Sequence, residues 1–457
     1  MSRTHTDVLI IGGGISGAAA AITGKSFYLT KRFMLIRKES QVIDPCSIPY
    51  VFGRLSDTTQ IQVPDDSLKK MGVAIETNEV VSIDQNNHAC KTADGSEIRF
   101  DKLILALGSV ADVPRWLEGR QIENVFTIPK DNQHVEKMVA SLESCGEIVI
   151  IGGGFVGFEV AYELADAGKQ VTIVEALPHL LGTAFDDEAG SKARIMLENR
   201  GIKVICGIEA TGIVGDSVAT GVLLSNGESL EADAVILATG YRPQTSLAEQ
   251  SGIATGETGA IPVDQYMRTR NPDILAAGDC AETRFFLTGR PNHIMLASTA
   301  CAEARIAAIN LFRLSAVMTF AGTVPIFCTA IGDTAFGSAG ITEKVAKHMN
   351  FNIFTATYTG VDKHPKSLPG THEQMVKLIV ARDSGVILGG EVVGGISTGE
   401  LTNLIGLAIQ NRMTVNSILI EQVGTHSLLT AAPNAYPLLK VAEIIAQRIW
   451  TTGRAKA

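Results

Sequence analysis

Two glycine-rich segments of equal spacing offer the clearest chemistry in this chain. Both follow the pattern GxGxxG, with Gly12, Gly14 and Gly17 in the first copy and Gly152, Gly154 and Gly157 in the second. Glycines at this spacing permit a tight turn, let the backbone approach a pyrophosphate, and allow a helix to pack closely on a strand. The helix N-terminus then presents unpaired N–H groups to the phosphates. Two such motifs predict two dinucleotide sites; a duplicated scaffold that has lost one ligand is the alternative.

The surrounding sequence contains the elements that must position these glycines. Each motif follows a short β-branched apolar run and precedes an alanine-rich helix and a second apolar strand, which is the βαβ unit of a dinucleotide-binding fold. The helices are expected at 18–22 and 160–167, and the second strands at 33–36 and 171–174. Further buried strands are expected at 103–109, 235–240 and 274–279, each running into a glycine turn at Gly108, Gly240 or Gly278.

The character of the sequence changes from about Pro325. Alternating apolar segments at 375–380 and 386–393 predict strands, and amphipathic patterns at 400–410 and 438–449 predict helices. No nucleotide motif occurs in this part. We therefore expect a third domain of mixed α+β type, and an interface is its most economical role.

Composition excludes several classes of function. The 457 residues are 46% apolar and 19% charged with a net charge of −9, as expected for a globular enzyme of two or three domains. No concentrated Lys/Arg surface is present for nucleic acid. The apolar stretch 8–22 looks like a signal-peptide core, but its glycines fit a strand entering a helix better, and no run approaches the ~20 apolar residues of a membrane span. A cytoplasmic protein is expected.

Seven cysteines are scattered along the chain without CxxC or metal-ligand spacing. An odd number of such cysteines in a large chain predicts reduced, mostly buried thiols and no metal site. Cys280 and Cys301 lie beside or within apolar helix patterns, so both are interpreted as packing residues.

By these motifs the chain resembles the pyridine nucleotide-disulfide oxidoreductase superfamily over essentially its whole length. Within it the chain resembles the single-cysteine branch of coenzyme A-disulfide reductases, NADH oxidases and peroxidases, and NADH-dependent polysulfide or persulfide reductases. The resemblance implies an α/β fold with two Rossmann-like domains and a C-terminal α+β dimerisation domain. The implied parts are a split FAD domain (1–115 and 250–324), an inserted NAD(H) domain (116–249) and the dimerisation domain (325–457) of a homodimer.

The resemblance also implies cofactor contacts. Gly12, Gly14 and Gly17 match the FAD glycines, and Gly152, Gly154 and Gly157 match the NAD glycines. Gly278-Asp279 matches a late motif whose aspartate contacts the ribityl–phosphate region of the flavin. Glu159 matches a glutamate near the nicotinamide, with a surface glutamate as the alternative.

The residues that end the second strands differ in charge. Glu175 stands where a carboxylate accepts the adenosine ribose hydroxyls and would repel a 2′-phosphate, which favours NADH over NADPH. In the FAD half, Arg37 occupies that position. Either Glu39 contacts the ribose after a small shift, or the backbone and water do.

The segment Pro45-Cys46-Ser47-Ile48-Pro49-Tyr50 resembles the active-site segment of the single-cysteine branch. Relatives with two cysteines carry the second about five residues on, where this chain has Val51. The partner of Cys46 would therefore be the flavin or an external sulfur. A thiolate is the nucleophile, and a helix N-terminus after Cys46, together with the flavin, is the expected source of its stabilisation. A buried structural cysteine is the alternative.

Other positions bear on the substrate. The oxidase and peroxidase relatives carry a histidine where this chain has Ile15, so disulfide, persulfide or polysulfide reduction is favoured, with a coenzyme A-linked substrate as one option. His426 lacks the following proline of two-cysteine relatives, and Ala431 stands in place of their glutamate. His426 is either a proton donor across a dimer interface or structural, and Tyr436 either donates to a substrate sulfur or packs.

The sequence thus predicts an FAD-dependent NADH oxidoreductase that acts on sulfur through Cys46. An NADH oxidase or peroxidase is the nearest alternative, and a flavoprotein delivering electrons to a protein partner is an alternative of another class. His364, between two lysines, is expected in a solvated loop.

Overall fold

The computed structural model describes residues 3–55 and 57–454. Their contacts group into two compact units, with residues 1–148, 211–222 and 231–323 in unit 1 and residues 149–210, 223–230 and 324–457 in unit 2. The predicted domain boundaries follow sequence motifs, whereas these units follow contacts, and the predicted NAD(H) domain contributes to both.

Unit 1 is built on a seven-stranded sheet of order β3-β2-β1-β6-β5-β4, in which β18 also pairs with β6. Its strands are β1 (Arg3–Ile11), β2 (Phe33–Arg37), β3 (Ala74–Thr77), β4 (Val80–Asp84), β5 (Ala89–Thr92), β6 (Glu97–Leu105) and β18 (Ile274–Ala276). The strands β3, β2, β1, β6 and β18 run parallel, and β5 and β4 are antiparallel. The parallel strands are buried apolar runs at 8–11, 33–36, 103–105 and 274–276, where both faces of the sheet are covered, whereas β3 at the edge is mostly exposed.

Two helices of unit 1, α1 (Ile15–Phe27) and α7 (Ala297–Ile309), pack against each other. Small residues allow this approach: a Cβ on Gly24 would lie 2.5 Å from the Phe33 ring and 3.6 Å from Ala308. The remaining elements of unit 1 are short and include α2 (Asp66–Lys70), α3 (Asn132–Leu142), α6 (Ser246–Gln250), η1 (Pro45–Phe52), η2 (Thr58–Ile61), β7 (Ser109–Ala111), β8 (Val125–Thr127), β15 (Ala234–Leu237), β16 (Tyr241–Pro243), β17 (Ile261–Pro262) and β19 (Ala281–Glu282).

Unit 2 begins with the second glycine motif and ends with the C-terminal sheet. Its first elements are α4 (Phe155–Asp166), β10 (Gln170–Glu175), α5 (Asp187–Asn199) and β11 (Lys203–Cys206), with β10 and β11 parallel. The boundaries between the two units fall within four strands. These are β9 (Glu147–Ile151), β12 (Ala210–Val214), β13 (Gly221–Leu224) and β14 (Ser229–Glu231).

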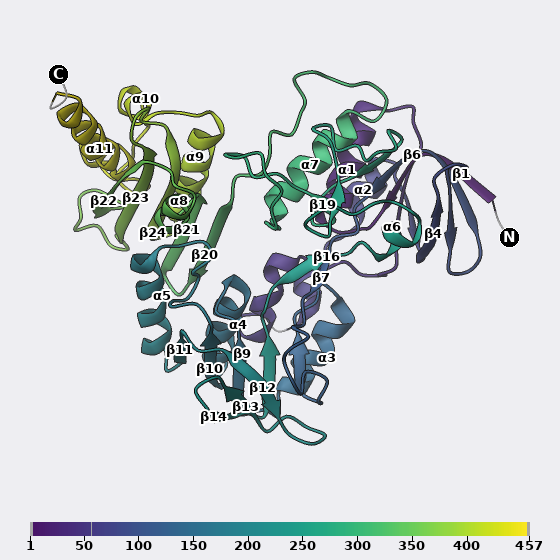
Figure 1. Ribbon diagram of the computed structural model, residues 1–457, viewed down its shortest axis with the longest axis horizontal. Helices are drawn as coiled ribbons and strands as arrows, with labels where there is room; N and C mark the ends of the chain where they lie inside the picture. Colours follow the sequence, from purple (N-terminus) through teal and green to yellow (C-terminus); the bar gives the residue numbers. More distant parts are fainter. Residues whose placement is uncertain (1–2, 56, 455–457) are drawn as a thin grey trace. The chain divides into compact units, whose positions relative to one another are not determined.

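The C-terminal part of unit 2 is an antiparallel sheet of order β20-β21-β24-β23-β22 covered by helices (Figure 1). The strands are β20 (Ile326–Ile331), β21 (Thr334–Gly340), β22 (Ile353–Val361), β23 (Glu373–Ala381) and β24 (Ile387–Gly394). Helix α9 (Thr398–Gln410) contacts β21 and β24, and α11 (Pro437–Arg454) contacts β22 and β23. Helices α8 (Glu343–His348), α10 (Val415–Ile420) and η3 (Pro433–Ala435) complete this part, which has the predicted strand and helix segments.

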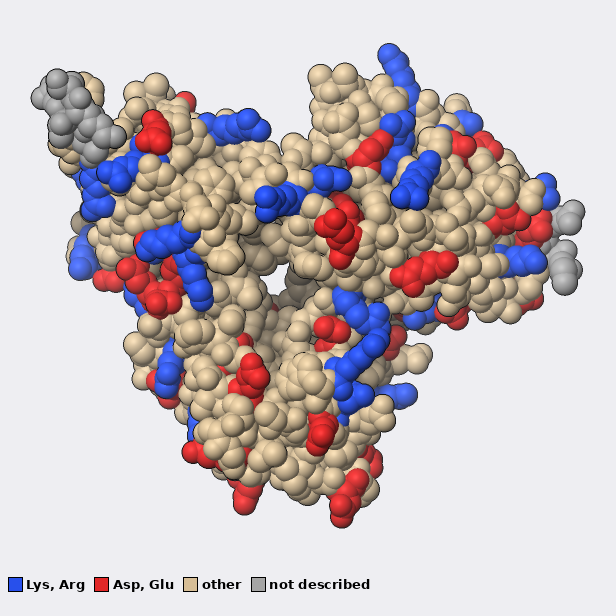
Figure 2. All heavy atoms as spheres, viewed as in Figure 1, with Lys and Arg blue, Asp and Glu red and all other residues tan. Residues whose placement is uncertain are grey.

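Acidic and basic side chains are interspersed on the face of the molecule drawn in Figure 2, without a continuous basic surface there. Within 3–55 and 57–454, none of the helices combines the length and the apolar character that crossing a bilayer demands.

Candidate active site

The first glycine motif forms the turn between β1 and α1, and steric contacts explain its glycines. Gly12 has φ +113°, and a Cβ there would lie 2.0 Å from the Ala106 carbonyl oxygen. A Cβ on Gly17 would lie 1.9 Å from the Gly12 carbonyl oxygen. Gly14, the N-cap of α1, faces open space. The turn is thus closed on the side of the sheet and open in front of the helix, where a phosphate would be bound.

The Gly278-Asp279 turn lies directly against this motif. Gly278 has φ +78°, and a Cβ there would lie 3.0 Å from Ser16. The Asp279 carboxylate accepts hydrogen bonds from Ser109 Oγ and Lys130 Nζ, both at 2.7 Å, and Lys130 Nζ also lies 2.8 Å from Ser109 Oγ. The two predicted FAD segments therefore meet, and a lysine and a serine orient the carboxylate.

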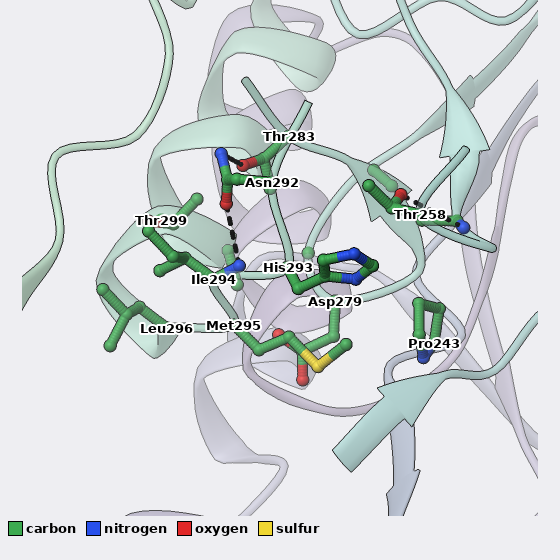
Figure 3. A pocket seen from close by; sticks show the side chains of 14 residues that line it. Pro243, Thr258, Asp279, Thr283, Asn292, His293, Ile294, Met295, Leu296 and Thr299 are labelled. Atoms are coloured by element: carbon green, nitrogen blue, oxygen red, sulfur yellow. Dashed lines mark hydrogen bonds between the residues drawn. The ribbon is translucent and has the colours of Figure 1, made fainter. Parts of the chain in front are cut away.

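A pocket opens beside Asp279, and Figure 3 shows it surrounded by side chains that include His293, Met295 and Pro243. Behind the turn, the N–H of Gly278 donates to Glu303, which is fully buried on α7. Burial raises the pKa of Glu303 to about 8, which favours the protonated form of its carboxyl at pH 7.

Two buried polar atoms here, Ser16 Oγ and Glu303 Oε1, have no hydrogen-bond partner among the described residues. Buried polar atoms of a folded protein normally have partners. The open space at Gly14 and the N-terminus of α1 offer room and donors for a phosphate. The residues present therefore fit a dinucleotide in this cradle.

Cys46 lies in the first turn of the 3-10 helix η1 and is exposed. The helix begins one residue before the cysteine, at Pro45, rather than after it as expected. Asp44 caps it: its carboxylate accepts the N–H of Cys46 at 3.2 Å and the hydroxyl of Ser47 at 2.6 Å. Helix η1 contacts α3. The exposure of Cys46 contradicts the alternative of a buried structural cysteine.

The other six cysteines differ more in burial than expected. Cys90, Cys145 and Cys280 are buried, whereas Cys206 and Cys301 are intermediate and Cys328 is exposed. The prediction of mostly buried thiols was therefore wrong for three of these six, and the packing interpretation holds more fully for Cys280 than for Cys301. Cys328 lies on β20, the edge strand of the C-terminal sheet. No group of three or more His, Cys, Asp or Glu within 3–55 and 57–454 has a metal-binding arrangement.

The second glycine motif repeats the geometry of the first in unit 2. Gly152 has φ +111°, Gly154 is the N-cap of α4 and faces open space, and Gly157 is buried. The Glu175 carboxylate ends β10 and accepts the N–H groups of Gly153 at 2.5 Å and Leu177 at 2.7 Å. The carboxylate is thus held beside the glycine turn, the position expected for a ribose contact.

Glu159 is a half-buried residue on the first turns of α4 and not the surface glutamate of the alternative interpretation. Its carboxylate accepts a hydrogen bond from the Thr329 hydroxyl of β20 at 2.6 Å. Burial raises the pKa of Glu159 to about 7 against the opposing effect of this hydrogen bond. The ring of Phe155, at the start of the same helix, stacks on Phe327 of β20 with centroids 5.0 Å apart.

We expect Glu175→Ala to narrow the preference for NADH over NADPH. Loss of a charged hydrogen bond costs about 1.5–3 kcal/mol, so kcat/KM for NADH should fall about 10-fold or more while that for NADPH does not. Glu188→Ala, which changes an exposed glutamate of α5, is the control and should leave the ratio unchanged. An unchanged ratio in Glu175→Ala would assign selectivity to another residue.

The predicted C-terminal residues lie in unit 2. His426 is exposed, and its Nδ1 accepts the N–H of Leu428 at 3.3 Å. Tyr436 is half-buried at the end of η3, and burial raises the pKa of its hydroxyl. His364 is not merely solvated as expected: its Nδ1 lies 2.9 Å from the Thr430 carbonyl oxygen, and its N–H donates to Ser427. It therefore holds the loop that carries His426.

The structure brings together Gly12, Gly14, Gly17, Gly278 and Asp279 in unit 1, and Gly152, Gly154, Gly157, Glu159 and Glu175 in unit 2. Gly108 and Gly240 have φ of +70° and +102°, and each accepts a backbone hydrogen bond. The sequence reasoning missed Ser109, Lys130 and Glu303. Their hydrogen-bond partners lie far away in the sequence, and no local pattern distinguishes these residues from other polar ones.

Fold and site define a flavin- and nicotinamide-dependent oxidoreductase with a dimerisation domain. Residues 6–304 match pyridine nucleotide-disulphide oxidoreductases, and residues 326–435 match the dimerisation domain of these enzymes. The chain belongs to the pyridine nucleotide-disulphide oxidoreductase family, which binds FAD and NAD(P)H.

Named relatives span both leading activities. The chain is 29% identical to the NADH oxidase of Methanocaldococcus jannaschii, covering 90% of this chain and 92% of that protein. It is 32% identical to the NAD(P)H coenzyme A polysulfide/persulfide reductase of Pyrococcus horikoshii, covering 85% and 87%. The solved NAD-dependent persulfide reductase from A. fulgidus superposes with a TM-score of 0.89 at 26% identity, covering 97% of this chain and 83% of that one.

Proposed function

We propose that this enzyme uses NADH to reduce the sulfur–sulfur bond of a small disulfide, persulfide or polysulfide through Cys46. The observation that carries the proposal is an exposed thiol on a capped helical turn in the same unit as the FAD glycines, with Val51 where two-cysteine relatives have a second thiol. The persulfide reductases among the relatives support a sulfur substrate.

In this proposal, bound FAD and NADH supply two electrons. The Cys46 thiolate attacks one sulfur of the substrate and forms a mixed disulfide, and the other sulfur leaves and takes up a proton. Reduction of the mixed disulfide regenerates the Cys46 thiolate and releases the second thiol. One NADH and one additional proton thus convert one S–S bond into two thiol groups.

The residues of the chain orient the Cys46 thiol and supply a proton to the leaving sulfur. Asp44 fixes the turn that carries Cys46 through the N–H of Cys46 and the hydroxyl of Ser47. We assign His426 or Tyr436 of a second subunit as the donor of the proton to the leaving sulfur, since the dimerisation-domain match supports a homodimer. His426 is exposed, so a partner can reach it.

A coenzyme A-linked substrate is the preferred member of the class. The P. horikoshii relative carries coenzyme A in its name. Lys363 and Lys366 beside His364 offer positive charge to an anionic carrier.

An NADH oxidase is the second candidate because the M. jannaschii relative bears that name. Ile15 argues against it, since an aliphatic side chain at this position of the first glycine motif cannot transfer protons.

The test is NADH consumption without oxygen in the presence of coenzyme A disulfide, coenzyme A persulfide, polysulfide or glutathione disulfide, with an aerobic assay lacking sulfur substrates beside it. We expect turnover with at least one sulfur compound to exceed turnover with oxygen. Turnover with oxygen alone would establish the oxidase instead.

A further inference from the structure

The end of β2 is where the two βαβ units of the chain differ most. In the second unit, Glu175 presents a carboxylate beside Gly153. In the first unit the equivalent residue is Arg37, which is 6% exposed and lies so close to Gly13 that a Cβ there would be 2.4 Å from Arg37 Cδ. A cation therefore covers the glycine turn at the position where the second unit has an anion.

The guanidinium of Arg37 is almost fully occupied by protein groups. Its Nη1 and Nη2 donate to the two carboxylate oxygens of Asp65 at 2.8 and 2.9 Å, which is a bidentate pair. Its Nε donates to the Glu39 carbonyl at 3.0 Å, and Nη2 also lies 3.4 Å from the Ser40 carbonyl oxygen. These bonds fix the guanidinium, and Asp65 balances its charge.

Asp65 comes from a different element than the one that normally supplies the ribose carboxylate. It immediately precedes α2, which packs on α1. The Asp65 side chain is 18% exposed, and each carboxylate oxygen accepts one bond from Arg37. An ionised carboxylate has about four acceptor positions, so acceptor capacity remains for a ligand.

Glu39 is placed differently. Its carboxylate lies 3.8 Å from the ammonium of Lys38, whose side chain is 63% exposed, and only its backbone carbonyl contacts Arg37. Asp65 is thus held by a buried partner, whereas the Glu39 carboxylate is not.

We propose that Asp65, held by Arg37, supplies the carboxylate that accepts the adenosine ribose hydroxyls of FAD in place of an acidic residue at the end of β2. Two side chains from separate elements, Arg37 and Asp65, thus take the place of the single acidic side chain at the end of β2. The proposal concerns the adenosine end of FAD only and is independent of which sulfur substrate the enzyme reduces.

The experiment measures the dissociation constants of FAD and FMN for the full-length protein after removal of its flavin, from the change in flavin fluorescence on binding. Asp65→Asn should weaken FAD binding about 10-fold or more, because a charged hydrogen bond is lost. FMN binding should not change, because FMN lacks the adenosine. Glu39→Gln is the matched control and should bind FAD as the unsubstituted protein does.

Asp65→Asn leaves the Arg37 guanidinium without its carboxylate and can therefore fold poorly. A second variant, in which both charged residues are replaced, keeps the test decisive in that case. In the double variant Arg37→Glu/Asp65→Ala, the guanidinium and its carboxylate are removed together, and a new carboxylate stands at the end of β2, where Glu175 of the second unit accepts backbone N–H groups. FAD affinity should return to within about threefold of the original. Unchanged FAD affinity in Asp65→Asn, equal losses for FAD and FMN, a loss in Glu39→Gln, or no recovery in the double variant would each overturn the proposal.

Discussion

Replacing Cys46 with serine is expected to lower sulfur-substrate reduction by at least about 10³-fold while FAD remains bound. A serine hydroxyl is not ionised near neutral pH and cannot form the mixed disulfide that the proposed reaction requires. The turn itself should persist, because Asp44 caps it through the N–H of residue 46 and the hydroxyl of Ser47, neither of which the substitution removes.

Cys328→Ser provides a matched control. Cys328 is also exposed, lies on a strand of unit 2 and has no active-site motif around it. Its replacement should leave turnover within about twofold of the unsubstituted enzyme, since surface substitutions have small effects. The measurement is steady-state NADH oxidation with the sulfur compound that gives the highest rate, together with the flavin absorbance of each variant.

The outcome separates sulfur reduction through Cys46 from delivery of electrons to a protein partner. If Cys46→Ser retains full sulfur reduction, the thiol is dispensable and delivery of electrons to a protein partner becomes the better explanation. If sulfur reduction is lost but NADH is still oxidised with oxygen, the variant keeps the NADH-dependent half of the reaction. That second result is the one expected.

Replacing Lys377 with methionine is expected to lower the free energy of unfolding by about 3–5 kcal/mol. Lys377 lies on β23, is 5% exposed, and places its ammonium 3.0 Å from both Asp186 and Glu343. Methionine retains most of the volume but leaves the buried Asp186 carboxylate without its cation, while Glu343 keeps only its exposed partner Lys347. Asp186 precedes α5 and Glu343 begins α8, so the pair of contacts joins the nucleotide-binding part of unit 2 to its C-terminal sheet.

Neighbouring groups set the charges of the carboxyls around Lys377. The Glu391 carboxyl accepts the N–H of Asp186 at 2.8 Å. Burial and the nearby Asp186 carboxylate raise the pKa of Glu391 to about 8, so it is neutral at pH 7. Although burial opposes it, the N–H groups of Glu343 and Lys344 together with Lys377 lower the pKa of Asp186. Lys377 is therefore the buried cation that balances the Asp186 carboxylate.

Urea unfolding followed by circular dichroism measures the effect, and Lys347→Met is its control. Lys347 pairs with the same Glu343 at 2.6 Å, but its side chain is 67% exposed. An exposed pair is worth less than about 1 kcal/mol, so this variant should unfold near the original urea concentration. Equal effects of the two substitutions would show that burial of Lys377 does not govern its contribution.

Local steric demands made much of the fold and both nucleotide cradles predictable. The Gly12 and Gly152 turns need positive φ and a missing Cβ, and these demands depend on a few neighbouring residues. The flanking strands are apolar because both faces of their sheet are covered. Cys46 was recognised through its prolines and tyrosine, a local pattern as well.

Pairings between distant residues could not be predicted in this way. Lys130 with Asp279 and Lys377 with Asp186 join elements far apart in the chain, and any acidic residue would have been an equally good partner on sequence grounds. His364 was expected in solvent, yet it holds the loop of His426. Arg37 was recognised as a departure, but only the tertiary structure showed that Asp65 neutralises it.

The difference between the predictable turns and the unpredictable ion pairs has one physical origin. Backbone conformation and burial periodicity are set by interactions within a few residues, so glycines and apolar runs reveal the strands, helices and turns directly. The energy of a buried charge depends on which opposite charge the fold brings within hydrogen-bond distance, and that is decided by the packing of whole elements. Local sequence is thus enough to predict the two glycine turns and the candidate thiol, whereas the ion pairs of Asp279, Arg37 and Asp186 depend on how distant elements pack.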